Sequence, residues 1–322
     1  MPNWLIKSGV QRVISWLPAS AWWNELFQRY VSRSLMVPES SFLGRMDEAS
    51  RFLDRFRRYQ PSAPDAIRVL EIGTGYYPTL PIAFWLCGAS SVHTFDIASL
   101  LSKQRLALIL DYFCTTAARG TLQQRLPAAR PERVELLKRL CPSMLLDSPA
   151  EALKRINIFV HVRDACDCGL ESASVDFIFS CGVLEYIPRT VLPQLLAEFR
   201  RVAAPNSAMI HYLNLVDQFH WFDPSIGRFN FLQYTDRQWR WRDSPMIPNN
   251  RLRINDFREH FTRAGFVLAA EENKSGSPDE LQRIRLAPQF QHYSREDLLV
   301  LYSLLTTLPV RQDASHKKQN GG

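Results

Sequence analysis

The sequence predicts a doubly wound α/β fold with a mostly parallel sheet, and three observations support this prediction. Short apolar runs of strand length recur along the chain, and segments with helical periodicity alternate with them. Most of these runs are continuously apolar, as expected for strands buried on both faces of a sheet. With 322 residues and 46% hydrophobic content, the chain is long enough to fill one large domain or two small ones.

Seven segments have the length and composition of strands. They are Arg68–Ile72, Ser91–Asp96, Ile156–Val162, Val175–Ser180, Ala208–Leu213, Phe266–Glu271 and Leu299–Leu305. We expect the last two to form an antiparallel, hairpin-like edge of the sheet.

The first 60 residues show helical periodicity and are rich in tryptophan. Apolar residues at helical spacing include Trp4, Val10, Ile14 and Leu17, and a second set runs from Trp22 to Leu35 with Ser20 as its N-cap. Four of the eight tryptophans lie within the first 23 residues. We favour a helical lid packed on the main domain. The alternative is an interfacial amphipathic segment that contacts a membrane peripherally, with Lys7, Arg12, Arg29 and Arg33 on its polar side.

Pro61–Pro64 has the composition of a linker, so we expect the lid at 1–60 and the main domain at 61–310. Two connections within that domain are long: 98–155 is mostly helical in pattern, and 214–256 is rich in aromatic residues and arginine. Long connections in a compact domain usually form lids or binding loops. The tail, 311–322, is predicted to be disordered.

The amino-acid composition does not identify a binding partner. The net charge of +7 and the pI near 9.2 fit either an anionic partner or a solvated basic surface. The six cysteines form no regular framework, and Cys166-Asp-Cys168 lacks the second knuckle of a zinc site. We therefore expect no metal. The first residues do not have the pattern of a signal peptide, and no apolar run approaches about 18 residues, so we expect a cytoplasmic protein.

The residues best suited to bind a ligand follow the predicted strands. Glu71-Ile-Gly73-Thr74-Gly75 joins the first strand to a helix, and glycines there permit a tight turn and close approach of a ligand. Asp96 ends the second strand, about 20 residues further on, where dinucleotide-binding folds place a ribose-binding acid. Asp164 follows the third strand. Open α/β sheets bind ligands at the carboxyl ends of their strands, so these residues predict one elongated ligand across the strand ends.

Four segments resemble motifs of the class I S-adenosylmethionine (SAM)-dependent methyltransferases. They are Val69–Gly75, Phe95–Ile97, Arg163–Ala165 and Asp176–Pro188. The resemblance covers residues 65–215. It implies a Rossmann-like, seven-stranded, mostly parallel sheet with SAM as the cofactor, here with an N-terminal helical lid and helical insertions.

The resemblance also implies roles for the first two strand ends. Glu71 and the backbone of Gly73–Gly75 would face the amino-acid end of SAM. Asp96 would bind the ribose hydroxyls, and Ile97 would lie against the adenine. Tyr77 stands where such loops often have a third glycine.

For the next two strand ends, the resemblance implies contacts with the adenine and the sulfonium. Asp164 would accept the adenine amino group, and Ala165 would add a backbone contact. Ser180, Cys181 and Gly182 would line the sulfonium.

A narrower resemblance extends beyond these motifs, to bacterial methyltransferases encoded among polysaccharide-biosynthesis genes. It rests on Asp217–Asp223, Arg228–Tyr234, Asn250–Arg253 and Leu286–Ser294. It implies a small hydroxylated acceptor, such as a sugar, a glycan or a glycolipid precursor.

Two residues are candidates for handling the acceptor's proton. His220 follows the fifth strand between Asp217 and Asp223, either of which could orient its ring, and histidine is the usual base near neutral pH. Glu185 could contact the substrate. Each also has a structural interpretation, His220 as part of an aromatic loop and Glu185 as a first-turn residue favoured by the helix dipole. Some small-molecule methyltransferases have Glu-His at this point, a few of them with a metal, and Tyr186 replaces that histidine.

Other residues in the second long connection could contact a substrate or serve the structure. Arg228, Arg251 and Arg253 could bind a phosphate or carboxylate by forked hydrogen bonds, or form ion pairs. Trp221, Tyr234, Trp239 and Trp241 could form a stacking wall or pack the loop.

The sequence leaves two alternatives to a small-molecule methyltransferase. A nucleic-acid or protein methyltransferase fits the basic pI. However, Ser180-Cys-Gly-Val stands where methyltransferases acting on base amines have an Asn/Asp-Pro-Pro-Tyr motif, and no basic stripe with interleaved aromatics is evident. The other alternative is a non-catalytic SAM-binding partner protein.

Overall fold

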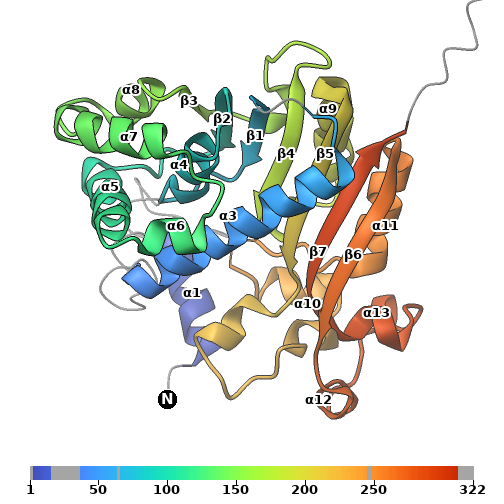
Figure 1. The fold of residues 1–322 in the computed structure, drawn as a ribbon. Helices are drawn as coiled ribbons and strands as arrows, with labels where there is room; N and C mark the ends of the chain where they lie inside the picture. The colour runs from blue at the N-terminus through green and yellow to red at the C-terminus, as the bar shows by residue number, and fades with distance from the viewer. Residues whose placement is uncertain (1–2, 16–36, 64–65, 245–247, 311–322) are drawn as a thin grey trace, which may run out of the picture.

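In the computed structural model, the described residues 3–15, 37–63, 66–244 and 248–310 contain a seven-stranded sheet with the order β3-β2-β1-β4-β5-β7-β6 (Figure 1). The strands are β1 (Arg68–Ile72), β2 (Ser91–Asp96), β3 (Ile158–Val162), β4 (Val175–Cys181), β5 (Ala203–Asn214), β6 (Phe266–Ser275) and β7 (Val300–Pro309). The predicted fold class is confirmed. The predicted helix from Trp22 to Leu35 and the predicted disordered tail lie outside the described residues.

The first five strands are parallel, and β7 runs antiparallel between β5 and β6. The prediction of an antiparallel edge is therefore confirmed. β6 continues beyond the predicted end at Glu271 through Glu272, Asn273 and Lys274. An antiparallel edge strand has a solvated face that accepts polar residues, so the end of the apolar run did not mark the end of the strand.

Helices cover both faces of the sheet (Figure 1). One face packs against α3 (Glu39–Tyr59), α4 (Thr79–Leu86), α5 (Lys103–Ala118), α6 (Thr121–Arg125), α7 (Pro131–Met144) and α8 (Pro149–Lys154). The other face packs against α9 (Leu192–Val202) and α11 (Ile254–Arg263). The connection 98–155 is mostly helical, as its pattern predicts, and supplies α5 to α8. Among the described helices, none is both long and apolar enough to cross a bilayer.

A third core lies beyond the carboxyl end of β5. It brings α1 (Trp4–Ser15) together with the second long connection, α12 (Pro278–Gln282) and α13 (Arg295–Leu299). The short elements of that connection are η3 (Gln218–Trp221), η4 (Asn230–Gln233) and α10 (Asp236–Arg240). The indole of Trp4 lies 5.2 Å from the ring of Phe219 and 6.3 Å from that of Trp239. The N-terminal helix is thus packed on the loop that follows β5.

The helix α3 shares its core with the sheet. Its buried aromatic residues follow helical spacing, and Phe56 lies 5.0 Å from the ring of Phe177 on β4. The buried Arg55 on the same helix forms an ion pair of 2.6 Å with Glu272 and a hydrogen bond to Thr306. These contacts attach α3 to the parallel and to the antiparallel part of the sheet.

We predict that Phe56→Ala lowers the free energy of unfolding by about 3–5 kcal/mol, because it leaves a cavity between α3 and the sheet. Denaturant unfolding followed by circular dichroism measures this change. Arg58→Ala, on the exposed side of the same helix, should change it by less than about 0.5 kcal/mol. Equal, small effects of the two variants would show that α3 is not part of the cooperative core.

Candidate functional site

The loop between β1 and α4 depends on two glycines with left-handed backbone. Gly73 has φ of +84° and Gly75 has φ of +62°. A Cβ atom on Gly73 would lie 2.4 Å from Cγ2 of Val183, whereas one on Gly75 would meet no atom within 3.9 Å. Gly73 is therefore required by the packing of the β4 loop, and Gly75 leaves open space beside the backbone.

The carboxylate of Asp96 joins the end of β2 to this loop. Its Oδ2 accepts a hydrogen bond of 2.9 Å from the amide of Gly75, and its Oδ1 accepts one of 3.0 Å from the amide of Ala98. A carboxylate has about four acceptor positions, so two remain for a ligand. Asp96 thus shapes the loop and keeps capacity to bind hydroxyl groups.

A cleft of about 230 Å³ lies beside Asp96. It is lined by Thr74, Gly75, Asp96, Ala98, Ser99, Leu100, Leu101, Ser148, Pro149, Ala150, Val160 and Val162. Ile97 and Val162 are 84% and 52% exposed in this region. The cleft therefore combines a carboxylate with apolar surface, which suits a sugar joined to a flat ring.

Asp164 and Ala165, the predicted adenine contacts after β3, are not among the residues that line the cleft. Oδ1 of Asp164 accepts a hydrogen bond of 2.8 Å from the amide of Cys166 and begins η1 (Ala165–Asp167), while Ala165 is buried. Only Val160 and Val162 of the β3 strand line the cleft. The roles of Asp164 and Ala165 stay predictions.

Behind the glycine loop, Glu71 is enclosed in a chain of hydrogen bonds. The hydroxyl of Thr94 donates to Oε2 of Glu71 at 2.5 Å and lies 2.5 Å from the hydroxyl of Thr74. Burial raises the pKa of Glu71 to about 8, although the Thr94 hydrogen bond and the charge of Arg45 oppose this rise. Glu71 thus holds the base of the loop as a largely protonated carboxyl near neutral pH.

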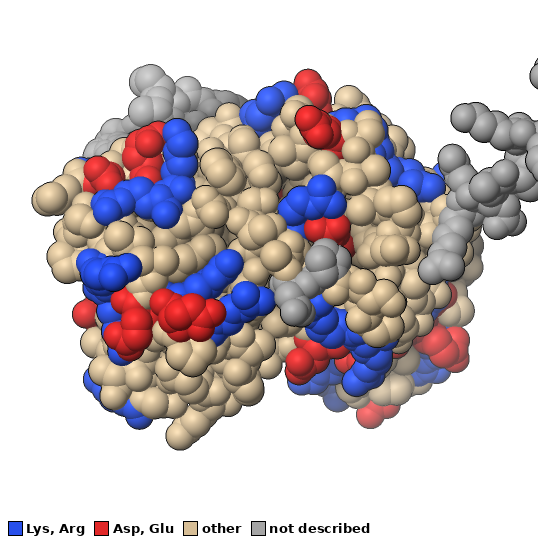
Figure 2. All heavy atoms as spheres, turned by 45° about the horizontal axis from the view of Figure 1, so that its top comes forward, with Lys and Arg blue, Asp and Glu red and all other residues tan. Residues whose placement is uncertain are grey.

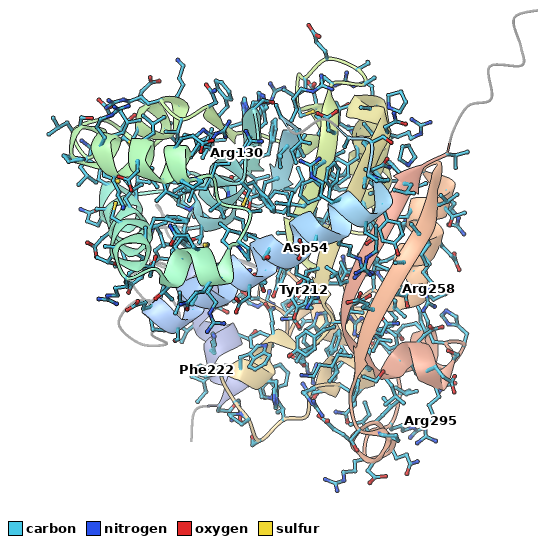
Figure 3. The ribbon with its side chains drawn as sticks, in the orientation of Figure 1. Asp54, Arg130, Tyr212, Phe222, Arg258 and Arg295 are labelled. Atoms are coloured by element: carbon cyan, nitrogen blue, oxygen red, sulfur yellow. The ribbon has the colours of Figure 1, made fainter. Side chains whose placement is uncertain are left out.

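Arg45, which the sequence did not indicate as a site residue, reaches the end of β4 from α3. Its Nη1 donates to Sγ of Cys181 at 2.8 Å and to Oε2 of Glu48 at 2.6 Å. Burial raises the pKa of the Cys181 thiol to about 12, so the thiol stays protonated. A guanidinium therefore lies at the end of β4, and its charge acts on Glu71 of β1. Tyr212 lies below the same helix (Figure 3).

Ser180 turns away from the strand edge. Its hydroxyl lies 2.8 Å from Nδ1 of His211, and both residues are fully buried. Burial lowers the pKa of His211 to about 3, so the ring is neutral. The side chains of His211 and Ser180 therefore both belong to the core.

Glu185 is buried in η2 (Leu184–Tyr186), next to the end of β4. Its Oε1 accepts a hydrogen bond of 3.2 Å from the amide of Asn214 and would lie 3.6 Å from a Cβ atom on Gly182. Its Oε2 has no hydrogen-bond partner within the described part of the chain. Burial raises the pKa of this carboxyl to about 8. A buried acid with an unused oxygen therefore stands beside the predicted sulfonium contact.

Two further buried carboxyls lie near Tyr186. Burial raises the pKa of Asp217 to about 6 and that of Asp243 to about 7. It also raises the pKa of the Tyr186 phenol, with smaller contributions from Glu185, Asp243 and Asp217. The region behind Glu185 is thus dry and acidic. Across the described residues, no group of three or more His, Cys, Asp and Glu side chains has the arrangement of a metal site.

His220 is held by a backbone carbonyl. Its Nδ1 donates to the carbonyl oxygen of Ile226 at 2.7 Å. Asp217 instead accepts from the amide of Phe219 and from Asn230, while Asp223 accepts from the amide of Trp4 and from Ser225. The expectation that a carboxylate orients the ring is therefore wrong, because both carboxylates satisfy backbone groups. A carbonyl partner leaves Nε2 as the unprotonated nitrogen of a neutral ring.

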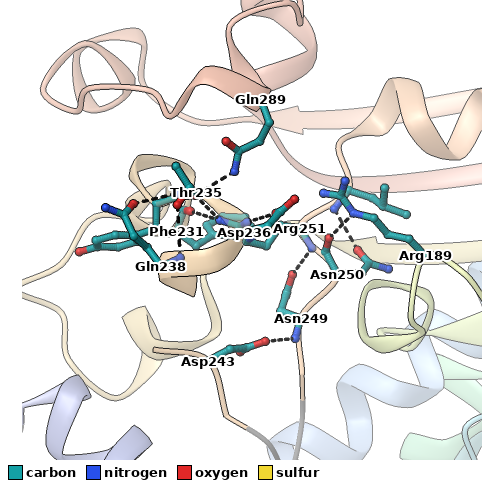
Figure 4. A network of polar contacts seen from close by, with 12 residues as sticks. Arg189, Phe231, Thr235, Asp236, Gln238, Asp243, Asn249, Asn250, Arg251 and Gln289 are labelled. Carbon is teal, nitrogen blue, oxygen red and sulfur yellow. Dashed lines mark hydrogen bonds and ion pairs between the residues drawn. The ribbon is translucent and has the colours of Figure 1, made fainter. Parts of the chain in front are cut away.

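Arg251 and Arg253 serve the structure. Arg251 is 2% exposed; it donates to the carbonyls of Phe231 and Tyr234 and pairs with Asp236 (Figure 4). Arg253 is fully buried and donates to the carbonyl oxygens of Leu215, Leu298 and Val300. The alternative in which these two arginines bind an anionic ligand is wrong, because their donors are taken by buried backbone carbonyl oxygens and, for Arg251, by Asp236.

Arg228 and two of the four loop aromatics also have structural contacts, and the other two aromatics are exposed. Arg228 forms a 2.5 Å ion pair with Glu280, so the ion-pair interpretation is confirmed. Trp239 is buried, and Tyr234 lies 6.0 Å from its ring. Only Trp221 and Trp241 of the four predicted stacking residues are mainly exposed, at 62% and 70%.

Comparisons with known proteins give one family match and several structural likenesses. Residues 135–211 match a family model described as a methyltransferase domain, and a search of curated proteins finds no match. The fold is similar to phosphoethanolamine N-methyltransferase 2 from Haemonchus contortus in complex with SAM, at 12% identity and a TM-score of 0.44, covering 88% of this chain and 59% of that one. It is also similar to the [4+2]-cyclase SpnF at 13% identity and a TM-score of 0.43, covering 81% and 82%. A SAM-dependent methyltransferase from Methanosarcina mazei matches at 14% identity and a TM-score of 0.42, covering 78% and 95%.

The strand ends fit SAM as the cofactor. Gly75 leaves space beside the backbone, Asp96 keeps free acceptor positions in the cleft, and Arg45 offers a cation near the ends of β1 and β4. Asp96 would suit the ribose of one elongated molecule, the apolar lining of the cleft its adenine, and Arg45 its carboxylate. Together with the match of residues 135–211 to a methyltransferase domain, these features indicate a SAM-dependent methyltransferase.

We predict that Asp96→Ala weakens SAM binding by roughly tenfold or more, because a hydrogen bond to a charged acceptor is worth about 1.5–3 kcal/mol. Isothermal titration calorimetry with SAM measures the loss. Asp111→Ala, which removes an exposed carboxylate on α5, should leave the affinity unchanged. Wild-type affinity of Asp96→Ala, with a wild-type melting curve, would contradict the assignment.

The buried acids also predict how stability depends on pH. Because the pKa values of Glu71 and Glu185 rise from 4.5 to about 8 on folding, the folded chain keeps protons that the unfolded chain has lost. This stability is fully present below pH 4.5 and is lost as the pH rises to about 8. Urea unfolding at several pH values should show this fall. Glu185→Gln should flatten it, whereas Glu135→Gln, at a 70% exposed carboxylate, should keep the wild-type slope.

Proposed function

We propose that this SAM-dependent methyltransferase methylates a hydroxyl group of a small acceptor, such as a sugar, a glycan or a glycolipid precursor. The observation that carries the proposal is the buried carboxyl of Glu185: its Oε1 lies beside Gly182, and its Oε2 has no hydrogen-bond partner among the described residues. A hydroxyl acceptor must lose its proton when it is methylated, and a base with a pKa near the working pH serves best.

When bound, SAM supplies a methyl group already activated on a sulfonium, so the protein's task is mainly alignment and exclusion of water. Asp96 would bind the ribose hydroxyls from the cleft. Arg45 would pair with the cofactor's carboxylate in place of Glu48. Glu185 would accept a hydrogen bond, and then the proton, from the acceptor hydroxyl.

His220 is the second candidate base. The hydrogen bond from Nδ1 to Ile226 fixes the tautomer in which Nε2 can accept a proton. The ring belongs to the loop after β5, and Asp217 of that loop lies near Tyr186. The two candidates are separated by the pH dependence of the rate.

The segments that carry the narrower resemblance form one network around η2. The amide of Asn250 donates to the carbonyl of Glu185, and its side chain donates to the carbonyls of Leu184 and Ile187. The next residue, Arg251, donates to the carbonyl oxygen of Phe231. The side chain of Gln289 donates to the carbonyl oxygen of Tyr234 in the same region (Figure 4). This network fixes Glu185 at the strand end, where an acceptor hydroxyl would have to lie.

A nucleic-acid acceptor gains less support from the surface. On the face shown in Figure 2, Lys and Arg side chains are interspersed with Asp and Glu and form no continuous basic stripe. Nucleic-acid binding sites gather positive charge along one track. We therefore favour a small-molecule acceptor.

The acceptor class can be tested with cell extracts. Purified protein is incubated with SAM carrying a deuterated methyl group and with a small-molecule extract, and labelled products are sought by mass spectrometry. We expect a sugar-containing product whose label survives conditions that cleave methyl esters. A label on an amine, on RNA or on protein would overturn the proposal.

With that acceptor, we predict that Glu185→Gln lowers kcat by roughly 100-fold or more and leaves the affinity for SAM unchanged. In the wild type, the rate should rise with pH through about 8 as the Glu185 carboxyl ionises, and Glu185→Gln should lose this rise. If His220→Ala removes the pH dependence and Glu185→Gln does not, His220 is the base. Unchanged activity of both variants would exclude both residues.

A further inference from the structure

The N-terminal helix α1 packs on the protein through its polar side. Ser8 and Gln11 are each 3% exposed, and Trp4 is 6% exposed. The hydroxyl of Ser8 donates to the carbonyl of Asp243, and the amide of Trp4 donates to the carboxylate of Asp223. This arrangement reverses the usual one, in which an amphipathic helix turns its apolar side inward.

The outward side of α1 is apolar. Leu5, Ile6, Val10 and Val13 are 49%, 65%, 36% and 57% exposed, and Gly9 lies between them with no atom within 4 Å of an added Cβ. At 3.6 residues per turn these five positions fall on one side of the helix. The charged residues of the helix, Lys7 and Arg12, flank that side at its two borders.

Aromatic and basic side chains of the second long connection continue this surface. The guanidinium of Arg12 lies 5.6 Å from the ring of Trp241, which is 70% exposed. The ammonium of Lys7 lies 4.6 Å from the ring of Phe222 (Figure 3). Arg237 and Arg240 on α10 are also exposed, and the carbonyl of Arg240 accepts a hydrogen bond from Arg12.

We propose that the outward side of α1, together with Trp241 and the neighbouring arginines, binds the surface of an anionic lipid bilayer. An exposed aliphatic stripe inserts among the lipid chains near the headgroups, while basic residues at its borders contact anionic headgroups. Tryptophan is favoured at this depth because one end of its ring is apolar and the other can form hydrogen bonds. The proposal is independent of the acceptor proposed above.

Charge favours a bilayer over two other occupants. A second copy of the chain, docked symmetrically, would bring the same cations of Lys7 and Arg12 against each other. Residues 16–36, which follow the helix, contain two arginines and one glutamate, so the net charge of that segment is positive as well. An anionic surface complements every charge on this side of α1.

The test is flotation of the full chain with lipid vesicles. We expect binding to vesicles of phosphatidylcholine and phosphatidylglycerol, little binding to phosphatidylcholine alone, and weaker binding as salt increases. The double variant Ile6→Glu/Val13→Glu should reduce the bound fraction at least tenfold. Val267→Glu/Leu268→Glu makes the same change in charge on β6, where the side chains are 49% and 42% exposed, and should bind like the wild type.

Several outcomes would overturn the proposal. They are failure of the wild type to float, equal flotation of both double variants, and equal flotation with neutral vesicles. A dimer in vesicle-free buffer that Ile6→Glu/Val13→Glu dissociates would assign the surface to a second copy. A loss of thermal stability in Ile6→Glu/Val13→Glu, absent from the control, would assign it to residues 16–36 of the chain itself.

Discussion

The site depends on the register of the parallel strands. Ile72 at the end of β1 lies opposite Phe95 on β2 and Ser180 on β4, and Asp96 lies opposite Val162 on β3. Four connections therefore start along one edge of the sheet, within reach of a single elongated molecule. The close contact between Gly73 and Val183 joins two of these connections directly. A slip of one residue in either pairing would turn the strand-end side chains to the opposite face.

Much of the architecture could be predicted because it depends on local patterns. The starts of β1, β2, β4 and β6 are the ones predicted from the sequence, and Asp96 follows the glycine loop at a distance that a βαβ unit imposes. What could not be predicted depends on contacts between distant residues. Arg45 and Cys181 are 136 residues apart, and no spacing along the chain brings them together. The carbonyl partner of His220 was missed because the pattern contains two nearby carboxylates and gives no sign that both are already occupied.

The arginines illustrate the same limit in terms of free energy. The second long connection runs through irregular backbone, and buried carbonyl oxygens without donors are costly. Arg251 supplies donors to two carbonyls of this connection and pairs with Asp236, and Arg253 donates to Leu215 of the connection and to Leu298 and Val300 beside it. Part of the positive charge is therefore inside the protein. Net charge counted from the sequence overstates the charge available on the surface for a partner.

The attachment of α3 limits how the active site can open. The helix carries Arg45 at the strand ends, and its phenylalanines and Arg55 anchor it to the sheet at several points along its length. A helix held in this way acts as a fixed wall, since swinging it outward would expose much of the main core. The connections around Leu100 and Ser148 form the other side of the strand ends. They line the cleft and are not anchored to the sheet in the way that α3 is. Any opening of the strand ends should therefore involve that side rather than α3.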